Sequence, residues 1–270
     1  MDGRVARPAN VPQTLRAACR GEIHRVFTPP FETPIVVVFN GLLAVLSWRL
    51  LPTGLRDLLF KPSDALAFPL VIGSWMLADV PATNILGNDA RLMGQVLGDE
   101  RALRRLLVAK NLVLWMLVTI PCLILTAIVA HEHKLGLSVG LVVYALILGP
   151  IGTLSLAGLL GILAPYHPIG LRRRWEHRRP TRRMITRWAI LVLLPYAYVP
   201  AVSKLLFAPV FHQCLLSGTC QTLKARHDPT LLAVAVLAIA AWALGHEASL
   251  RLIRRRRWKL AHFLRNPELG

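Results

Sequence analysis

Six long apolar stretches constrain this chain more than any other feature of its sequence. A helix needs about 20 mostly apolar residues to cross the hydrocarbon core of a bilayer. The stretches that meet or approach this length are 34–51, 65–86, 111–130, 136–163, 188–211 and 230–245. We expect each to be a membrane-spanning helix, and the fourth to be one helix bent at Gly149-Pro150.

The composition agrees with a membrane protein. Hydrophobic residues make up 54% of the 270 residues, charged residues only 17%, and the mean hydropathy is +0.50. Soluble domains contain about 25% charged residues, and a soluble domain needs them to cover its surface. Disordered chains are poor in apolar residues, so disorder is excluded as well. The sequence therefore predicts an all-α, polytopic integral membrane protein with six transmembrane helices.

The basic residues predict how the spans are oriented. The chain has 32 Lys and Arg against 14 Asp and Glu, a net charge of +18. Twenty-five of the 32 fall in four segments that alternate with the predicted spans, namely 1–25, 91–110, 172–187 and 251–265. This bias follows the positive-inside rule, so we expect a multi-pass protein of the plasma (inner) membrane with both termini cytoplasmic. Each basic cluster adjoins a span, so anionic lipids explain the clusters and nucleic acid is not expected.

Three regions are expected. Residues 1–33 form a cytoplasmic tail, 34–250 the six-helix transmembrane domain, and 251–270 a basic cytoplasmic tail. Within the first region, apolar residues recur every three to four positions between arginines, which predicts an amphipathic helix on the inner membrane surface. Those apolar residues are Val11, Leu15, Cys19, Ile23 and Val26 or Phe27. The alternative is a disordered basic tail.

Few residues suggest covalent chemistry. Cys214 and Cys220 lie in a loop expected on the outer side, where a disulfide is plausible, and two free thiols are the alternative. Nucleotide-binding and serine-nucleophile motifs are missing from the sequence, and its HEH segment at 131–133 is a weak metal signal. We therefore expect no metal, no cofactor and no catalytic residue.

Polar residues within or beside the apolar stretches are the remaining candidates for function. Asp79, Asn84 and Glu247 fall near the inner ends of the second and sixth predicted spans. Ionisable residues at membrane depth often mark a substrate or proton path. The alternative interpretation is that the carboxylates pair with neighbouring arginines at the cytoplasmic rim.

Two segments carry a resemblance to a known family. Residues 82–125 contain Asn84, then Gly87-Asn88-Asp89, then Lys110-Asn111 at the start of the next span, and 161–174 reads GILAPYHPIGLRRR. These segments resemble the permease subunits of ABC-2-type transporters over about residues 65–180. The chain departs from the family pattern in two places. Ala90 stands where glycine is common, and Gly98-Asp99-Glu100 replaces a proline-containing turn.

The resemblance implies a transport function. In that family the loop between the second and third spans forms a coupling helix that docks on the ATPase. Here that loop is 88–105, and the residues expected to contact the ATPase are Asp89, Arg91, Asp99, Glu100 and Arg101. The chain would be the membrane subunit of an ATP-driven exporter, itself not an enzyme, with a separate ATPase subunit and a homodimeric or paired permease. The alternative for the loop is a surface helix that contacts only lipid.

Two other classes of protein remain as alternatives. A lipid-processing membrane enzyme would need its carboxylates and amides to converge at the inner headgroup level, where Asp79, Asn84, Asp89 and Glu247 are expected. A non-catalytic membrane assembly protein would need no such convergence.

Overall fold

The computed structural model describes residues 11–29, 31–52, 84–132, 139–165 and 229–266, with a few isolated positions besides. Every regular element in these ranges is a helix, which confirms the predicted all-α class for this part of the chain. The helices are α1 (Leu15–Val26), α2 (Glu32–Leu50), η1 (Gly87–Asp89), α6 (Ala90–Val96), α7 (Glu100–Glu132), α8 (Val139–Leu163) and α12 (Pro229–Arg265).

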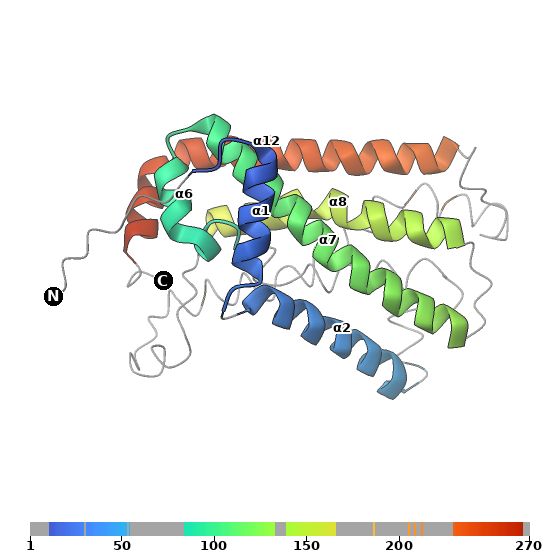
Figure 1. The fold of residues 1–270 in the computed structure, drawn as a ribbon. Coiled ribbons are helices and arrows are strands. Elements are labelled where there is room, and N and C mark those ends of the chain that lie inside the picture. The colour runs from blue at the N-terminus through green and yellow to red at the C-terminus, as the bar shows by residue number, and fades with distance from the viewer. Residues whose placement is uncertain are drawn as a thin grey trace.

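The four long helices lie side by side as a bundle (Figure 1). Helices α2 and α7 start at the same end of the bundle, and α8 and α12 run back toward that end. Consequently α8 and α12 are parallel to each other, and their contact is the most extensive in the described fold. The short helices α1 and α6 lie across the end where α7 begins and α12 finishes, and we call this the capped end (Figure 1).

The hydrophobic core lies at the capped end. It is built mainly from α6, the first turns of α7 and the last turns of α12, with the fully buried Ile162 from α8. Met93 of α6 is completely buried, and Leu264 of α12 lies against the neighbouring Gly94. The apolar residues of the 90–107 segment are thus buried against protein.

Away from the capped end, the long helices expose apolar side chains. On α7 the exposed positions recur every four residues and form one stripe, which consists of Leu112, Met116, Ile120, Ile124 and Ile128. Helices α2 and α12 also have exposed apolar side chains, such as Phe39 and Leu232. Contiguous apolar surface is rare on soluble monomers, and it is the surface that contacts lipid in membrane helices.

Two of the described helices are long and apolar enough to cross a membrane by length and composition. These apolar segments are Glu100–Ile124 and Leu231–Arg265. Helices α2 and α8 contain shorter apolar segments, at Thr33–Leu43 and Ile147–Leu163. Among the described residues, the structure therefore supports two of the six predicted spans.

Other predictions fall partly or wholly outside the described residues. The fifth predicted span, 188–211, lies almost entirely outside them, and so do Cys214 and Cys220. Of the second predicted span only 84–86 is described, and these residues form a turn instead of the end of a helix.

The stretch 251–265, expected as a basic cytoplasmic tail, continues α12 as one helix. The reason is a helical period of buried apolar residues that persists between the arginines, with Leu250, Ile253, Leu260 and Leu264 all in the core.

Helix α8 is a single helix through Pro150, as expected. Side chains of Trp115 and Arg256 donate hydrogen bonds to its backbone from the neighbouring helices. The indole N–H of Trp115 donates to the carbonyl oxygen of Ile147 at 3.0 Å, in the turn where proline disturbs the backbone ladder. At the end of α8, Arg256 Nη1 donates to the carbonyl oxygens of Ile162 (3.3 Å) and Leu163 (2.9 Å). A guanidinium at this position satisfies carbonyls that have no partner within the helix.

We expect truncation of Met93 to destabilise the fold strongly. Met93→Ala removes a completely buried side chain, and such changes cost about 2–5 kcal/mol. Ile120→Ala is the matched control, because Ile120 is 58% exposed on the apolar stripe of α7. Thermal unfolding of the two variants in the same detergent measures the difference. Equal melting temperatures would show that the core is not at the capped end.

Candidate functional site

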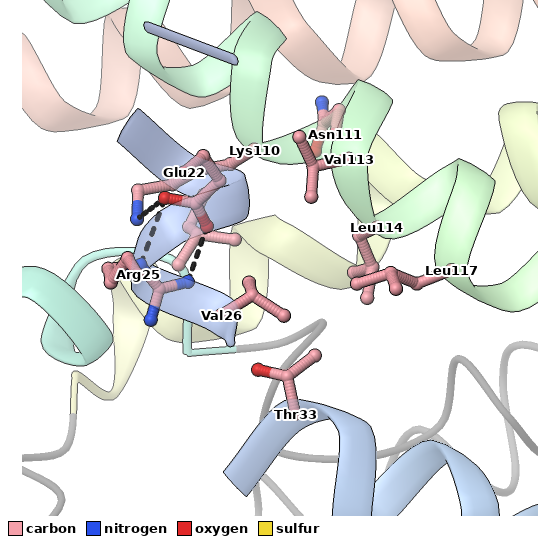
Figure 2. Close-up of a pocket in the computed structure, with 10 residues that line it drawn as sticks. Glu22, Arg25, Val26, Thr33, Lys110, Asn111, Val113, Leu114 and Leu117 are labelled. Carbon is pink, nitrogen blue, oxygen red and sulfur yellow. Dashed lines mark hydrogen bonds and ion pairs between the residues drawn. The ribbon is translucent and has the colours of Figure 1, made fainter. Parts of the chain in front are cut away.

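A buried ion pair joins α1 to α7 at the capped end. Lys110 Nζ lies 3.1 Å from Glu22 Oε2, and the two side chains are only 6% and 9% exposed. Arg25, one turn further along α1, donates from Nε to the same Oε2 at 2.9 Å and from Nη2 to Oε1. Figure 2 shows the carboxylate held between these two cations, each on a different helix.

The sequence of α1 explains how Glu22 reaches this position. Thr14 caps the helix, its Oγ1 accepting a hydrogen bond from the Ala17 N–H at 3.2 Å. Four-residue spacing then places Ala18, Glu22 and Val26 on one buried face. This face packs on α7, so the Glu22 carboxylate is directed at Lys110.

The charge state of Glu22 follows from competing effects. Burial alone raises the pKa of this carboxyl, but the Lys110 ammonium and the Arg25 guanidinium outweigh it and lower the pKa from 4.5 to about 2. The carboxylate is therefore charged at neutral pH, although it is nearly excluded from water. A buried charge of this kind depends on its partners, because an unpaired one is costly.

A small cavity adjoins the ion pair. Its lining comes mainly from α1, α2 and α7, with Ile85 from the turn before η1. It includes Thr33 and Asn111 besides Glu22, Arg25 and Lys110 (Figure 2). Its volume of about 10 Å³ has room for roughly one water molecule. The cavity is thus a polar contact point between three helices, too small to hold a transported solute.

A second, more exposed set of ion pairs joins α7 to α12, and we call it the rim network. Arg104 Nη2 lies 3.0 Å from Glu247 Oε2 and 3.9 Å from Glu100 Oε1. Glu247 also approaches Arg251 at 3.7 Å, and Glu100 approaches Arg254 at 3.9 Å. Glu247 therefore pairs with arginines, as the alternative interpretation of this residue predicts.

The rest of the predicted intramembrane polar site is placed as follows. Asn84 is completely buried, in the turn just before η1, whereas Glu247 lies in the rim network on α12. Asp79 lies outside the described residues. Among those residues, no group of three His, Cys, Asp or Glu side chains is arranged to hold a metal ion.

The loop expected to contain a short coupling helix is divided into three elements. Residues 88–105 comprise the end of η1, then α6, then the first turns of α7, separated by a turn at Leu97 and Gly98. The break is stabilised by Asp99, whose Oδ1 accepts from the backbone N–H of Arg101 (3.0 Å) and Ala102 (3.1 Å) and so caps α7. The position of this break was not predicted, because the cap by Asp99 was not recognised from the sequence.

Most of the residues expected to contact the ATPase are exposed. Arg91, Asp99, Glu100 and Arg101 are exposed, and Asp89 is partly buried. Two of them also have structural roles, since Asp99 caps α7 and Glu100 belongs to the rim network. Arg91 and Arg101 have no ion pair with any described residue.

Sequence reasoning missed the role of Glu22. The available signal was its isolation, because Glu22 is the only acidic residue between positions 3 and 31. It also shares a helical face with Ala18 and Val26. An acid on the apolar face of an otherwise basic helix indicates a buried basic partner, which here is Lys110.

We compared the chain with protein-family models, curated proteins and solved structures, and none of the three comparisons gave a match.

We expect Glu22→Gln to destabilise the protein strongly. The change leaves the Lys110 ammonium buried without its counter-charge, and breaking such a pair costs about 3–5 kcal/mol. Glu100→Gln is the control, because its side chain is 54% exposed and exposed pairs contribute about 0–1 kcal/mol. Unfolding in detergent measures both. The double variant Glu22→Gln, Lys110→Met should recover part of the loss, and no recovery would contradict the pairing.

The attachment of α1 to α7 should weaken at acidic pH. Because the pKa of Glu22 is lower in the folded protein than the ordinary 4.5, its stabilising contribution is complete above pH 4.5. The contribution is lost as the pH falls toward about 2. Hydrogen exchange of the α1 amides should therefore accelerate across this range. The Glu22→Gln variant should exchange fast throughout, and a pH response in that variant would assign the effect to another group.

Proposed function

We propose that this chain is the membrane-spanning permease subunit of an ATP-driven ABC-type exporter. The observation that supports this most is the segment 87–105. It forms a short helix packed into the core of the bundle, with charged residues on its outer side, and it continues through a capped turn directly into α7. A segment with this construction can transmit a push from a docked ATPase to a long apolar helix.

The proposed topology has six spans, with both termini on the cytoplasmic side of the plasma membrane. The directions of the described helices support it. Helices α2 and α7 leave the capped end, and α8 and α12 return to it, as spans one, three, four and six would in that topology (Figure 1). Basic residues gather at the capped end, where the positive-inside rule expects the cytoplasm.

Movement of α6 would reach several helices at once. Met93 and Val96 are buried in the same core as residues of α7 and α12, so α6 does not shift without displacing them. The Glu22–Lys110 pair extends this connection to α1. Lys110 and Asn111 are also the pair that carries part of the family resemblance, and both are buried at this contact.

The proposal requires other subunits. Because the sequence has no Walker A motif, ATP hydrolysis belongs to a separate ATPase subunit. Six spans amount to half of the usual transporter core, so the functional unit would be a homodimer or a paired permease. Transport would then proceed by alternating access, with the spans rearranging as rigid elements when the ATPase closes.

An ATPase subunit should co-purify with the chain and depend on two exposed arginines. We expect Arg91→Gln with Arg101→Gln to lower recovery of a Walker A-containing protein about tenfold. The reason is that an exposed charge pair contributes up to about 1 kcal/mol, so that losing two of them weakens binding by about 1.4 kcal/mol, which is tenfold. Affinity purification from native membranes, followed by mass spectrometry, measures the recovery.

The matched control is Arg255→Gln with Lys259→Gln, which removes the same charge from exposed positions on α12. It should leave ATPase recovery unchanged. If both double variants retain the ATPase, or if the wild-type chain recovers none, the proposed function is wrong.

A further inference from the structure

An apolar groove lies between α1 and α7, on the side of α1 away from the capped core. Its volume is about 300 Å³. The lining side chains are Ile23, Phe27, Val113, Met116, Leu117, Ile120 and Pro121. Ile23 and Phe27 are 41% and 53% exposed, so nothing in the described fold covers the α1 wall of the groove. The groove is large enough for part of a ligand of modest size.

The α7 wall of the groove belongs to the exposed apolar stripe. Met116 and Ile120 line the groove and are also the second and third members of that stripe. The groove therefore opens sideways onto the surface that would face acyl chains if α7 spans a membrane. An occupant can enter from the bilayer without passing through water.

One side of α1 adds positive charge to this apolar site. Arg16, Arg20, Ile23 and Phe27 are spaced four, three and four residues apart, so they lie along one side of the helix axis. All four are exposed. The two arginines thus precede the groove by one and two turns, about 5 and 10 Å along the helix.

We propose that this groove is a binding site for one anionic phospholipid. An acyl chain lies between Ile23, Phe27 and the α7 stripe, and the headgroup phosphate pairs with Arg16 and Arg20. The guanidinium group favours phosphate because it can donate two parallel hydrogen bonds. The apolar lining and the adjacent cations together fit an amphiphile with a negative headgroup. A soluble anion would use only the cations, and a neutral lipid would use only the apolar lining.

The groove lies beside the buried ion pair between Glu22 and Lys110, and this position suggests that its occupant stabilises the contact of α1 with α7. Glu22 lies on the same helix, on the face turned toward Lys110, while Ile23 faces the groove. A lipid seated in the groove therefore contacts α1 directly beside the buried ion pair. It would hold α1 against α7 from the membrane side. The inference rests on the proposed membrane location of α7 and is independent of the ATPase partner.

The test uses the full chain, purified in a neutral detergent and incubated with a photoactivatable phosphatidylglycerol that carries its reactive group on the acyl chain. The matching phosphatidylcholine probe is the neutral reference. After irradiation, mass spectrometry maps the labelled peptides. We expect labelling in 23–27 and 113–121, with phosphatidylglycerol favoured at least about fivefold, because one basic residue near an anionic lipid contributes about 1 kcal/mol.

Two pairs of variants separate the headgroup from the groove. Arg16→Gln with Arg20→Gln should lower phosphatidylglycerol labelling to the phosphatidylcholine level, whereas Arg255→Gln with Lys259→Gln, exposed on α12, should not. Met116→Trp should reduce labelling by both probes because it fills the groove. Leu244→Trp, at a 72% exposed position of α12, should leave labelling unchanged.

Three outcomes would overturn the proposal. They are equal labelling by both probes in the wild-type chain, labelling spread evenly over the apolar surface of α12, and full labelling in the Arg16, Arg20 variant while circular dichroism shows it folded. Loss of ATPase recovery affects none of these readouts. Absence of labelling anywhere on the α7 stripe would instead reject the membrane location itself.

Discussion

The contact between Glu22 and Lys110 determines how the capped end is assembled. Each charge is nearly excluded from water, so each needs an opposite charge beside it. Sliding α1 by one turn along α7 would leave the Lys110 ammonium buried and unpaired, and Glu22 paired only with Arg25 of its own helix. The pair therefore fixes the position of α1 along α7. That position determines where the chain enters α2. It also determines which side of α1 packs on protein and which side forms the apolar groove. Its value lies in specificity of position more than in net stability.

The bundle combines two kinds of surface that require different surroundings. At the capped end, α6 and the ends of α7 and α12 enclose a core of protein side chains beneath a charged exterior. Along the remaining length, apolar side chains of α2, α7 and α12 point outward. Because α7 and α12 extend through both regions, a displacement of the core at one end necessarily moves surfaces along the bundle. This continuity is the physical basis of the proposed coupling.

Much of the fold could be predicted from local sequence patterns. The pairings between residues far apart in the sequence could not. Apolar length predicted α7 and α12, and the periodicity of residues 11–27 predicted the helix α1. The apolar face of α1 was expected to lie on the membrane, and Leu15, Ile23 and Phe27 of that face are exposed. The face that packs on protein, with Ala18, Glu22 and Val26, was not recognised from the sequence. The partner that makes burial of Glu22 possible lies 88 residues away, beyond the reach of any periodicity. The basic end of α12 is a similar case. Its many arginines indicated a tail, whereas its apolar residues Ile253, Leu260 and Leu264 are buried in the core.

The two sets of ion pairs differ in their sensitivity to ionic strength. In the rim network the side chains are between 35% and 70% exposed, so mobile ions can screen them, and the Debye length contracts from about 8 Å at physiological salt to about 3 Å at 1 M. The Glu22–Lys110 pair excludes those ions. Concentrated salt therefore weakens the ion pairs between α12 and the start of α7, while the ion pair between α1 and α7 persists. The two contacts at the capped end can thus be distinguished by ionic strength alone.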